Sequence, residues 1–285
     1  MSAAAERHPA ASPPAGGAPA GSTPYGTANI QLRAFMALCG RDLWVTVRHE
    51  LGSFLAQALL QPIFLLFVFG RVLPEIGSAR VGYAGQLLPG VMALTIVLTA
   101  LQNTALPLVI EFSFTKEIED RLLAPLPVVA VALQKILIAS LRGILAGLLI
   151  LPLGALILPG GLQISGPDWP ALVGLFVFGS VAAGAMGLVL GTAVPPNRIS
   201  VAFAVVLTPL IFTGCTFFPW NSLHTLRWFQ ILTLVNPITY LSEGLRGALT
   251  TFPHLAGGWI ALGLGVSLVL FGALGARLFI RRALD

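Results

Sequence analysis

The chain has 285 residues, of which 56% are hydrophobic and only 9% are charged, and its formal net charge is +5. A soluble domain carries about 25% charged residues, so this composition excludes a soluble fold, and it equally excludes a disordered chain, which would be poor in apolar residues. We therefore expect an integral membrane protein.

The first 27 residues combine five prolines with many alanines and glycines. Such a segment cannot build a packed core, so residues 1–27 are predicted to form a disordered cytoplasmic tail. The segment also lacks the continuous apolar stretch of a cleavable signal peptide.

Residues 28–50 have the pattern of an amphipathic helix. Arg33, Arg41 and Arg48 share one side of a helical wheel. The apolar residues on the other side are Phe35, Met36, Cys39, Leu43 and Val47. This pattern predicts an interfacial helix along the cytoplasmic membrane surface, with a solvated linker helix as the alternative.

Six apolar stretches are long enough to cross a bilayer, which takes about 20 residues. We place these spans near residues 52–73, 85–109, 136–158, 170–193, 200–219 and 255–276. The predicted fold is an all-α integral membrane domain over residues 28–285. Arg142 lies within the third span, and because a charge in the membrane is costly we expect its side chain to extend towards the cytoplasmic headgroups.

The basic residues between the spans predict the orientation. With the N-terminus inside, eleven of them fall on the cytoplasmic side and four on the outer side, Arg142 left aside. The outer four are Arg71, Arg80, Arg227 and Arg246. Since cytoplasmic loops carry an excess of Lys and Arg, both termini are predicted to be cytoplasmic.

Several kinds of chemistry find no support in the sequence. No acidic residue lies near the middle of a span, which disfavours an ion-coupled carrier. His49-Glu50 begins a zinc-protease-like pattern, but Ser53 stands where the second histidine is needed. Cys39 and Cys215 suggest neither a disulfide framework nor a metal site. No glycine precedes a lysine as a P-loop requires, so another polypeptide would have to hydrolyse any ATP used.

The loop between the second and third spans is the most polar stretch. Lys116 with Asp120, and Glu117 with Arg121, form opposite-charge pairs at helical spacing. Pro125 and Pro127 then disfavour further helix. We expect a short helix on the cytoplasmic face, with a solvated connector as the alternative.

Residues 217–250 are too apolar for an open loop and too charged for a spanning helix. We expect two short re-entrant or interfacial helices that are broken at Asn236-Pro237. Trp220, Trp228 and Tyr240 suit the membrane interface. Glu243 and Arg246 stand three residues apart on the second helix and are expected to pair.

Motifs in these segments resemble those of the membrane subunits of type-2 ATP-binding-cassette exporters, including the daunorubicin-resistance permeases. The motifs, in chain order, are Gln61-Pro62-Ile63, Leu87-Leu88-Pro89-Gly90, Lys116-Glu117 through Leu122-Leu123-Ala124-Pro125, Phe218-Pro219, and Asn236-Pro237 with Glu243 and Arg246. Two departures are Ile118, where a glycine is common, and the absence of a second proline near Leu223-His224.

The resemblance implies three sets of functional residues. Those expected to couple to the ATPase through charge-assisted contacts are Lys116, Glu117, Glu119, Asp120, Arg121 and Pro125. Those expected to line a substrate path between two subunits are Gln57, Gln61, Gln102, Asn103, Thr104, Thr208, Phe212, Thr213 and Phe217. Those expected to form an outer gate are Phe218, Pro219, Asn236, Pro237, Glu243 and Arg246. Helix packing and a structural cap are the alternatives for the last two sets.

The family also implies the partners: two ATPase subunits that bind ATP and magnesium, and a second permease copy or paralogue in a bacterial inner membrane. This chain itself would hold no cofactor or metal, would catalyse no reaction and would bind no nucleic acid. The expected cargo is a hydrophobic drug or antibiotic, with a lipid, glycolipid or polysaccharide as the alternative. An ATP-independent channel or carrier is less favoured.

Overall fold

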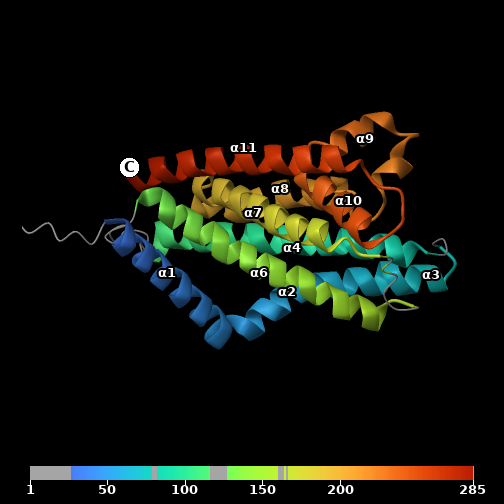
Figure 1. Cartoon of the computed structure of the whole chain (residues 1–285), viewed down its shortest axis with the longest axis horizontal. Helices are drawn as coiled ribbons and strands as arrows, with labels where there is room; N and C mark the ends of the chain where they lie inside the picture. The colour runs from blue at the N-terminus through green and yellow to red at the C-terminus, as the bar shows by residue number, and fades with distance from the viewer. Residues whose placement is uncertain (1–26, 79–81, 116–126, 160–163, 165, 285) are drawn as a thin grey trace, which may run out of the picture.

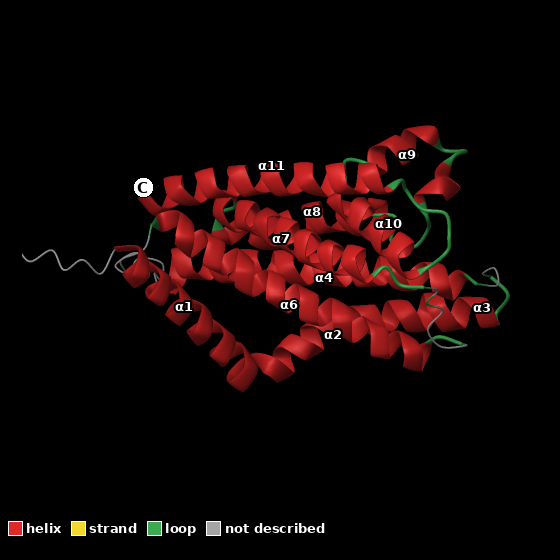
Figure 2. Cartoon of the chain, viewed as in Figure 1, coloured by secondary structure: helices red, strands yellow, loops and turns green. Residues whose placement is uncertain are grey.

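The computed structural model describes residues 27–78, 82–115, 127–159, 164 and 166–284, and in these residues it contains helices and loops but no strand (Figure 2). The predicted tail, residues 1–27, lies outside the described residues except for Thr27, where the first helix begins. The all-α architecture that the composition predicted is confirmed.

Six helical stretches of the described residues are long and apolar enough to cross a membrane. These are Asn29–Glu75, Tyr83–Ser113, Val128–Ile157, Trp169–Ala193, Pro196–Thr213 and Gly257–Ala283. The six predicted spans are therefore confirmed in number and order.

The first stretch is bent. Helix α1 (Thr27–Val45) leads through a π-helical turn, η1 (Thr46–Glu50), into α2 (Leu51–Phe67), and Figure 1 shows the two helices meeting at an angle. A second π-helical turn, η2 (Val68–Val72), and the short α3 (Leu73–Glu75) follow. The helix predicted over residues 28–50 is thus present, while its position at a membrane surface stays a prediction.

The centre of the bundle is α4 (Tyr83–Ile110), which η3 (Glu111–Thr115) extends. It packs against α2, α6 (Val128–Ile157), α7 (Trp169–Ala193) and α10 (Pro237–Leu249). The approach to α7 is close because a side chain on Gly187 would overlap the Leu101 carbonyl group. Small residues permit such contacts between membrane helices.

The fifth candidate span ends earlier than predicted. A 3-10 turn, η4 (Pro196–Arg198), leads into α8 (Ile199–Thr213), and the helix stops six residues before position 219. The physical reason lies just beyond it, where Cys215 adopts a φ of 49°, a left-handed conformation that cannot continue a right-handed helix.

Segments after α8 form a hairpin at one end of the bundle. It contains η5 (Trp220–Leu223), α9 (Arg227–Thr233) and α10, and the last span, α11 (Gly257–Leu284), follows. We call this end the hairpin end, and the opposite end, where α1 begins and α11 finishes, the terminal end (Figure 1). The break that the sequence placed at Asn236-Pro237 is confirmed.

Candidate transport groove

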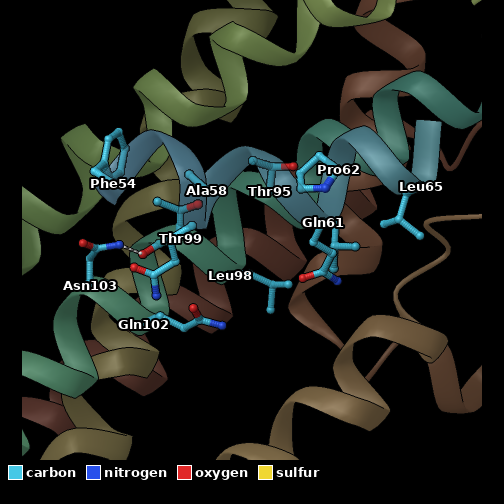
Figure 3. A pocket seen from close by; sticks show the side chains of 12 residues that line it. Phe54, Ala58, Gln61, Pro62, Leu65, Thr95, Leu98, Thr99, Gln102 and Asn103 are labelled. Carbon is cyan, nitrogen blue, oxygen red and sulfur yellow. Dashed lines mark hydrogen bonds between the residues drawn. The ribbon is translucent and has the colours of Figure 1, made fainter. Parts of the chain in front are cut away.

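A groove lies between α2 and α4, and four predicted path residues line it: Gln57, Gln61, Gln102 and Asn103 (Figure 3). We call it the amide groove. Its other lining residues are Phe54, Ala58, Pro62, Leu65, Leu94, Thr95, Leu98 and Thr99. None of the twelve carries a formal charge, so the groove joins an apolar wall to a row of carboxamides.

The carboxamides differ in how they are held. Asn103 donates from Nδ2 to the Thr99 carbonyl oxygen at 2.9 Å and accepts from Arg142 at 2.7 Å, so its orientation is fixed. Gln57 and Gln61 lie exposed on α2, and no hydrogen bond to another described residue holds their amides. An unpaired amide in hydrocarbon is costly, so this face favours contact with protein, cargo or water over contact with lipid.

Other predicted path residues lie outside the amide groove. Thr104 is fully buried on the side of α4 that faces Gly187 of α7. Thr208 and Phe212 are exposed on α8. Thr213 and Phe217 belong to the approach to the hairpin, where Phe217 packs against Phe69 with ring centroids 5.1 Å apart.

Helix α8 is the least covered of the candidate spans, because none of its residues is buried in the single chain. Behind it, an apolar pocket of about 450 Å³ extends towards α7, α11 and the hairpin. Leu101, Met186 and Phe271 line the deep side of this pocket, and Thr213 and Asn236 supply its polar atoms. The helix therefore contacts the rest of the bundle only loosely.

At the break in the hairpin, Asn236 caps α10. Its Oδ1 accepts from the Ile238 amide at 2.9 Å, as an N-cap side chain does. Its Nδ2 donates to the Leu210 carbonyl oxygen at 2.8 Å and to Thr213 Oγ1 at 2.9 Å. Pro237 occupies the first turn of α10, where its missing N–H does no harm. Asn236 thus connects the start of α10 to the end of α8.

Glu243 and Arg246 form the predicted pair, and both side chains are 0% exposed. Each carboxylate oxygen also accepts a backbone N–H at 2.9 Å, Oε1 from Trp220 and Oε2 from Leu255. Arg246 donates in turn to the carbonyl oxygens of Gln86 and Cys215. One ion pair therefore joins α10 to α4, to the segment after α8 and to the segment before α11. We call this arrangement the hairpin clamp.

The other two predicted gate residues lie beside the clamp. Phe218 packs against Phe229 of α9 with ring centroids 6.3 Å apart, and Pro219 immediately precedes η5. The structure therefore brings all six predicted gate residues into the hairpin. The Glu243 carboxylate is buried and both of its oxygens accept hydrogen bonds. This arrangement favours movement of the hairpin as one body over opening at Glu243.

Arg142 is held by partners within the protein, and the expected reach of its side chain towards the cytoplasmic headgroups stays a prediction. Its guanidinium donates to Asn103 Oδ1 at 2.7 Å, to Glu50 Oε2 at 2.9 Å and to Thr46 Oγ1. Three acceptors within the protein thus share the guanidinium, which stays partly exposed. No local pattern indicates Glu50 as a partner of Arg142, since 92 residues separate the two.

Further polar contacts lie on the side of Arg142 that is nearer the terminal end. Lys135 pairs with Glu111 in a buried salt bridge, and Gln134 donates to Asp42 of α1 at 2.8 Å. All six predicted coupling residues, Lys116, Glu117, Glu119, Asp120, Arg121 and Pro125, lie outside the described residues. The described chain resumes at Pro127, immediately before α6.

Comparison with known proteins places these features in a family. The description "ABC-2 type transporter" matches residues 33–250. The inner membrane transport permease YadH of Escherichia coli K12 is 24% identical over 213 residues, which cover 72% of this chain and 80% of the relative. The proteins of the same name in E. coli O157:H7 and Shigella flexneri match equally. The chain therefore belongs to the ABC-2 type transporter family, the family that its motifs indicated.

Proposed function

We propose that this chain is the permease subunit of an ATP-driven exporter and that its cargo is a hydrophobic drug or antibiotic. The observation that carries the proposal is the uncharged lining of the amide groove, which joins apolar walls to hydrogen-bonding amides in a chain with six candidate spans; the groove measures about 30 Å³ in the single chain, so the second subunit would complete a space of cargo size. Binding sites for small molecules commonly combine apolar walls with a few polar groups in this way.

A second permease copy or paralogue would complete the path. Gln57 and Gln61 on α2, with Thr208 and Phe212 on α8, are exposed in the single chain. Glutamine in contact with lipid is unfavourable, whereas in contact with another membrane helix it forms hydrogen bonds. We infer that these two helices face the second subunit and that the amide groove opens towards it.

Energy would come from two separate ATPase subunits, because the chain has no P-loop lysine. The coupling segment over residues 111–127 and the N-terminal helix α1 would dock on them. Both termini would then be cytoplasmic, as the distribution of basic residues indicates, and the membrane would be a bacterial inner membrane, as for the permease YadH.

Cargo of another class, a lipid, glycolipid or polysaccharide, is the second candidate, favoured by the row of hydrogen-bonding amides.

The experiment is to isolate the chain with its natural partners, identify them and measure which compounds stimulate ATP hydrolysis. An associated ATPase that hydrophobic drugs stimulate supports the proposal. Stable isolation without any ATPase would overturn it, and stimulation by lipid-linked sugars alone would replace the cargo class.

Coupling is tested by charge reversal at Glu117→Arg and Arg121→Glu, each alone and together. We expect each single variant to lower cargo-stimulated ATP hydrolysis in the assembled complex, since charge-assisted contacts would become repulsive. Unchanged coupling and transport in both single variants would exclude a role for these residues.

A further inference from the structure

A second pocket, of about 270 Å³, lies next to the amide groove towards the terminal end. Six of its lining side chains belong to charged residue types, three acidic and three basic: Arg41, Asp42, Glu50, Glu111, Lys135 and Arg142. We call it the charged vestibule. Its balanced charges contrast with the amide groove, which has none.

The two pockets share α4: the amide groove lies between α2 and α4, and the charged vestibule is lined from α1, η1, α4, η3 and α6. Asn103 lines both of them. Glu50 of the vestibule stands one helical turn before Phe54 of the groove, and Pro107 stands one turn after Asn103 on α4. The charged vestibule and the amide groove therefore adjoin each other and form one polar path.

Arg142 lies at the junction of the two parts. From α6 its guanidinium reaches Asn103 on α4 and both Thr46 and Glu50 on the turn between α1 and α2. A single side chain thus ties together three elements at the point where the charged vestibule meets the uncharged groove. The Arg142 side chain therefore lies across the connection between the charged vestibule and the amide groove.

The contacts that hold Arg142 in this position can exchange. The Arg142 and Glu50 side chains are 17% and 48% exposed. A partly exposed ion pair contributes less free energy than a fully buried one, so this pair opens more easily than the Glu243–Arg246 pair. The groups that now hold Arg142 are a carboxamide oxygen, a carboxylate and a hydroxyl, all acceptors, so a ligand that replaces them must present acceptor oxygens.

We propose that the charged vestibule is the entrance of the cargo path from the terminal end, and that Arg142 is the positioning residue that closes its junction with the amide groove. The cargo enters when its acceptor oxygens displace Asn103 and Glu50 from Arg142. This inference rests on the proposed transport function and adds to it a cargo with an oxygen-bearing polar group beside its apolar part.

The test uses a thiol reporter inside the groove. Thr99 is buried on the groove side of α4, and Thr104 is buried one turn further on the side that faces α7. Thr99→Cys is therefore the reporter and Thr104→Cys the matched control, both with Cys39→Ser in the full chain. The purified chain, with any subunits that co-elute, is reconstituted in lipid nanodiscs and labelled with the small neutral reagent N-ethylmaleimide.

Adding Arg142→Gln should raise the labelling rate of the Thr99→Cys reporter at least about tenfold, because one lost hydrogen bond to a charged group corresponds to a shift of that size or more. The control should label as before. The exchanged pair Glu50→Arg with Arg142→Glu should restore protection of the reporter. No rise at the reporter, or an equal rise at the control, would overturn the proposal.

Transport by the same variants separates this proposal from the proposed function. If the unchanged complex shows no ATP-driven transport, the proposed function fails, while labelling still reports on the junction. If Arg142→Gln opens the junction in a working complex but cargo transport keeps its rate and selectivity, the entrance role of Arg142 is overturned.

Discussion

The hairpin end and the bend between α1 and α2 each hold an arginine–glutamate pair, but the two pairs are built differently. Glu243 and Arg246 are three residues apart, 0% exposed and surrounded by backbone partners. Arg142 and Glu50 come from distant elements and remain partly exposed. A buried pair with several backbone partners fixes a structure, whereas a partly exposed pair can exchange partners. The comparison indicates a rigid hairpin end and an adjustable contact at the bend between α1 and α2.

The largest expected effect comes from breaking each of the two pairs. Glu243→Gln should lower the free energy of unfolding by about 3–5 kcal/mol, because it leaves the buried Arg246 charge uncompensated. The matched Glu50→Gln should lower it by about 1 kcal/mol or less, because water reaches that pair. Denaturant titration of the purified protein in mild detergent measures both. Equal losses would remove the distinction between the two pairs.

A smaller effect is expected from a methyl group placed between α4 and the hairpin. A Cβ on Gly90 would overlap the Thr216 carbonyl group, so Gly90→Ala should cost about 1–3 kcal/mol of stability through overpacking. Gly265→Ala on α11 is the control, because nothing lies within 4 Å of the added atom. Thermal unfolding compares the two variants. A Gly90→Ala protein as stable as the control would show that the hairpin shifts away from α4 to make room for the added methyl group.

The sequence predicted local features better than long-range ones. The break at Asn236-Pro237 and the pairing of Glu243 with Arg246 depend on neighbours in the chain, so spacing and the properties of proline were sufficient. The pairing of Arg142 with Glu50 depends on how α6 packs against the bend after α1, which no local pattern encodes. The early end of α8 depends on the conformation of Cys215, for which the residue type gave no signal.

Candidate site residues follow the same rule. Gln57, Gln61, Gln102 and Asn103 were chosen as polar residues in apolar spans, and the structure gathers them because two neighbouring helices carry them. Thr104 was chosen by the same criterion, yet it lies on the opposite side of α4, where it donates to the Ala100 carbonyl oxygen. A hydroxyl group can satisfy itself within its own helix, so it indicates a path less well than a carboxamide does.

The smallest expected effect concerns the two cysteines, which report on the two ends. Burial, with a smaller contribution from the Glu243 carboxylate, raises the pKa of the Cys215 thiol to about 11. The thiol should therefore stay protonated and unlabelled by maleimide between about pH 7 and 9, since the thiolate is the reactive form. Cys39 on α1 is only partly buried and should label over this range. Labelling of Cys215 in folded protein would contradict a closed hairpin end.

ATP-driven transport through the amide groove is the central claim, and one measurement tests it most directly. The complex of this chain with its co-purifying ATPase is reconstituted in proteoliposomes, and uptake of a fluorescent hydrophobic drug into inside-out vesicles is followed with and without ATP. We predict ATP-dependent uptake that falls at least about tenfold in Gln61→Leu with Gln102→Leu, because cargo loses two hydrogen-bonding partners, and that persists in the control Thr104→Ala. Uptake that does not depend on ATP would contradict the account. Uptake at an unchanged rate in the double variant would also contradict it.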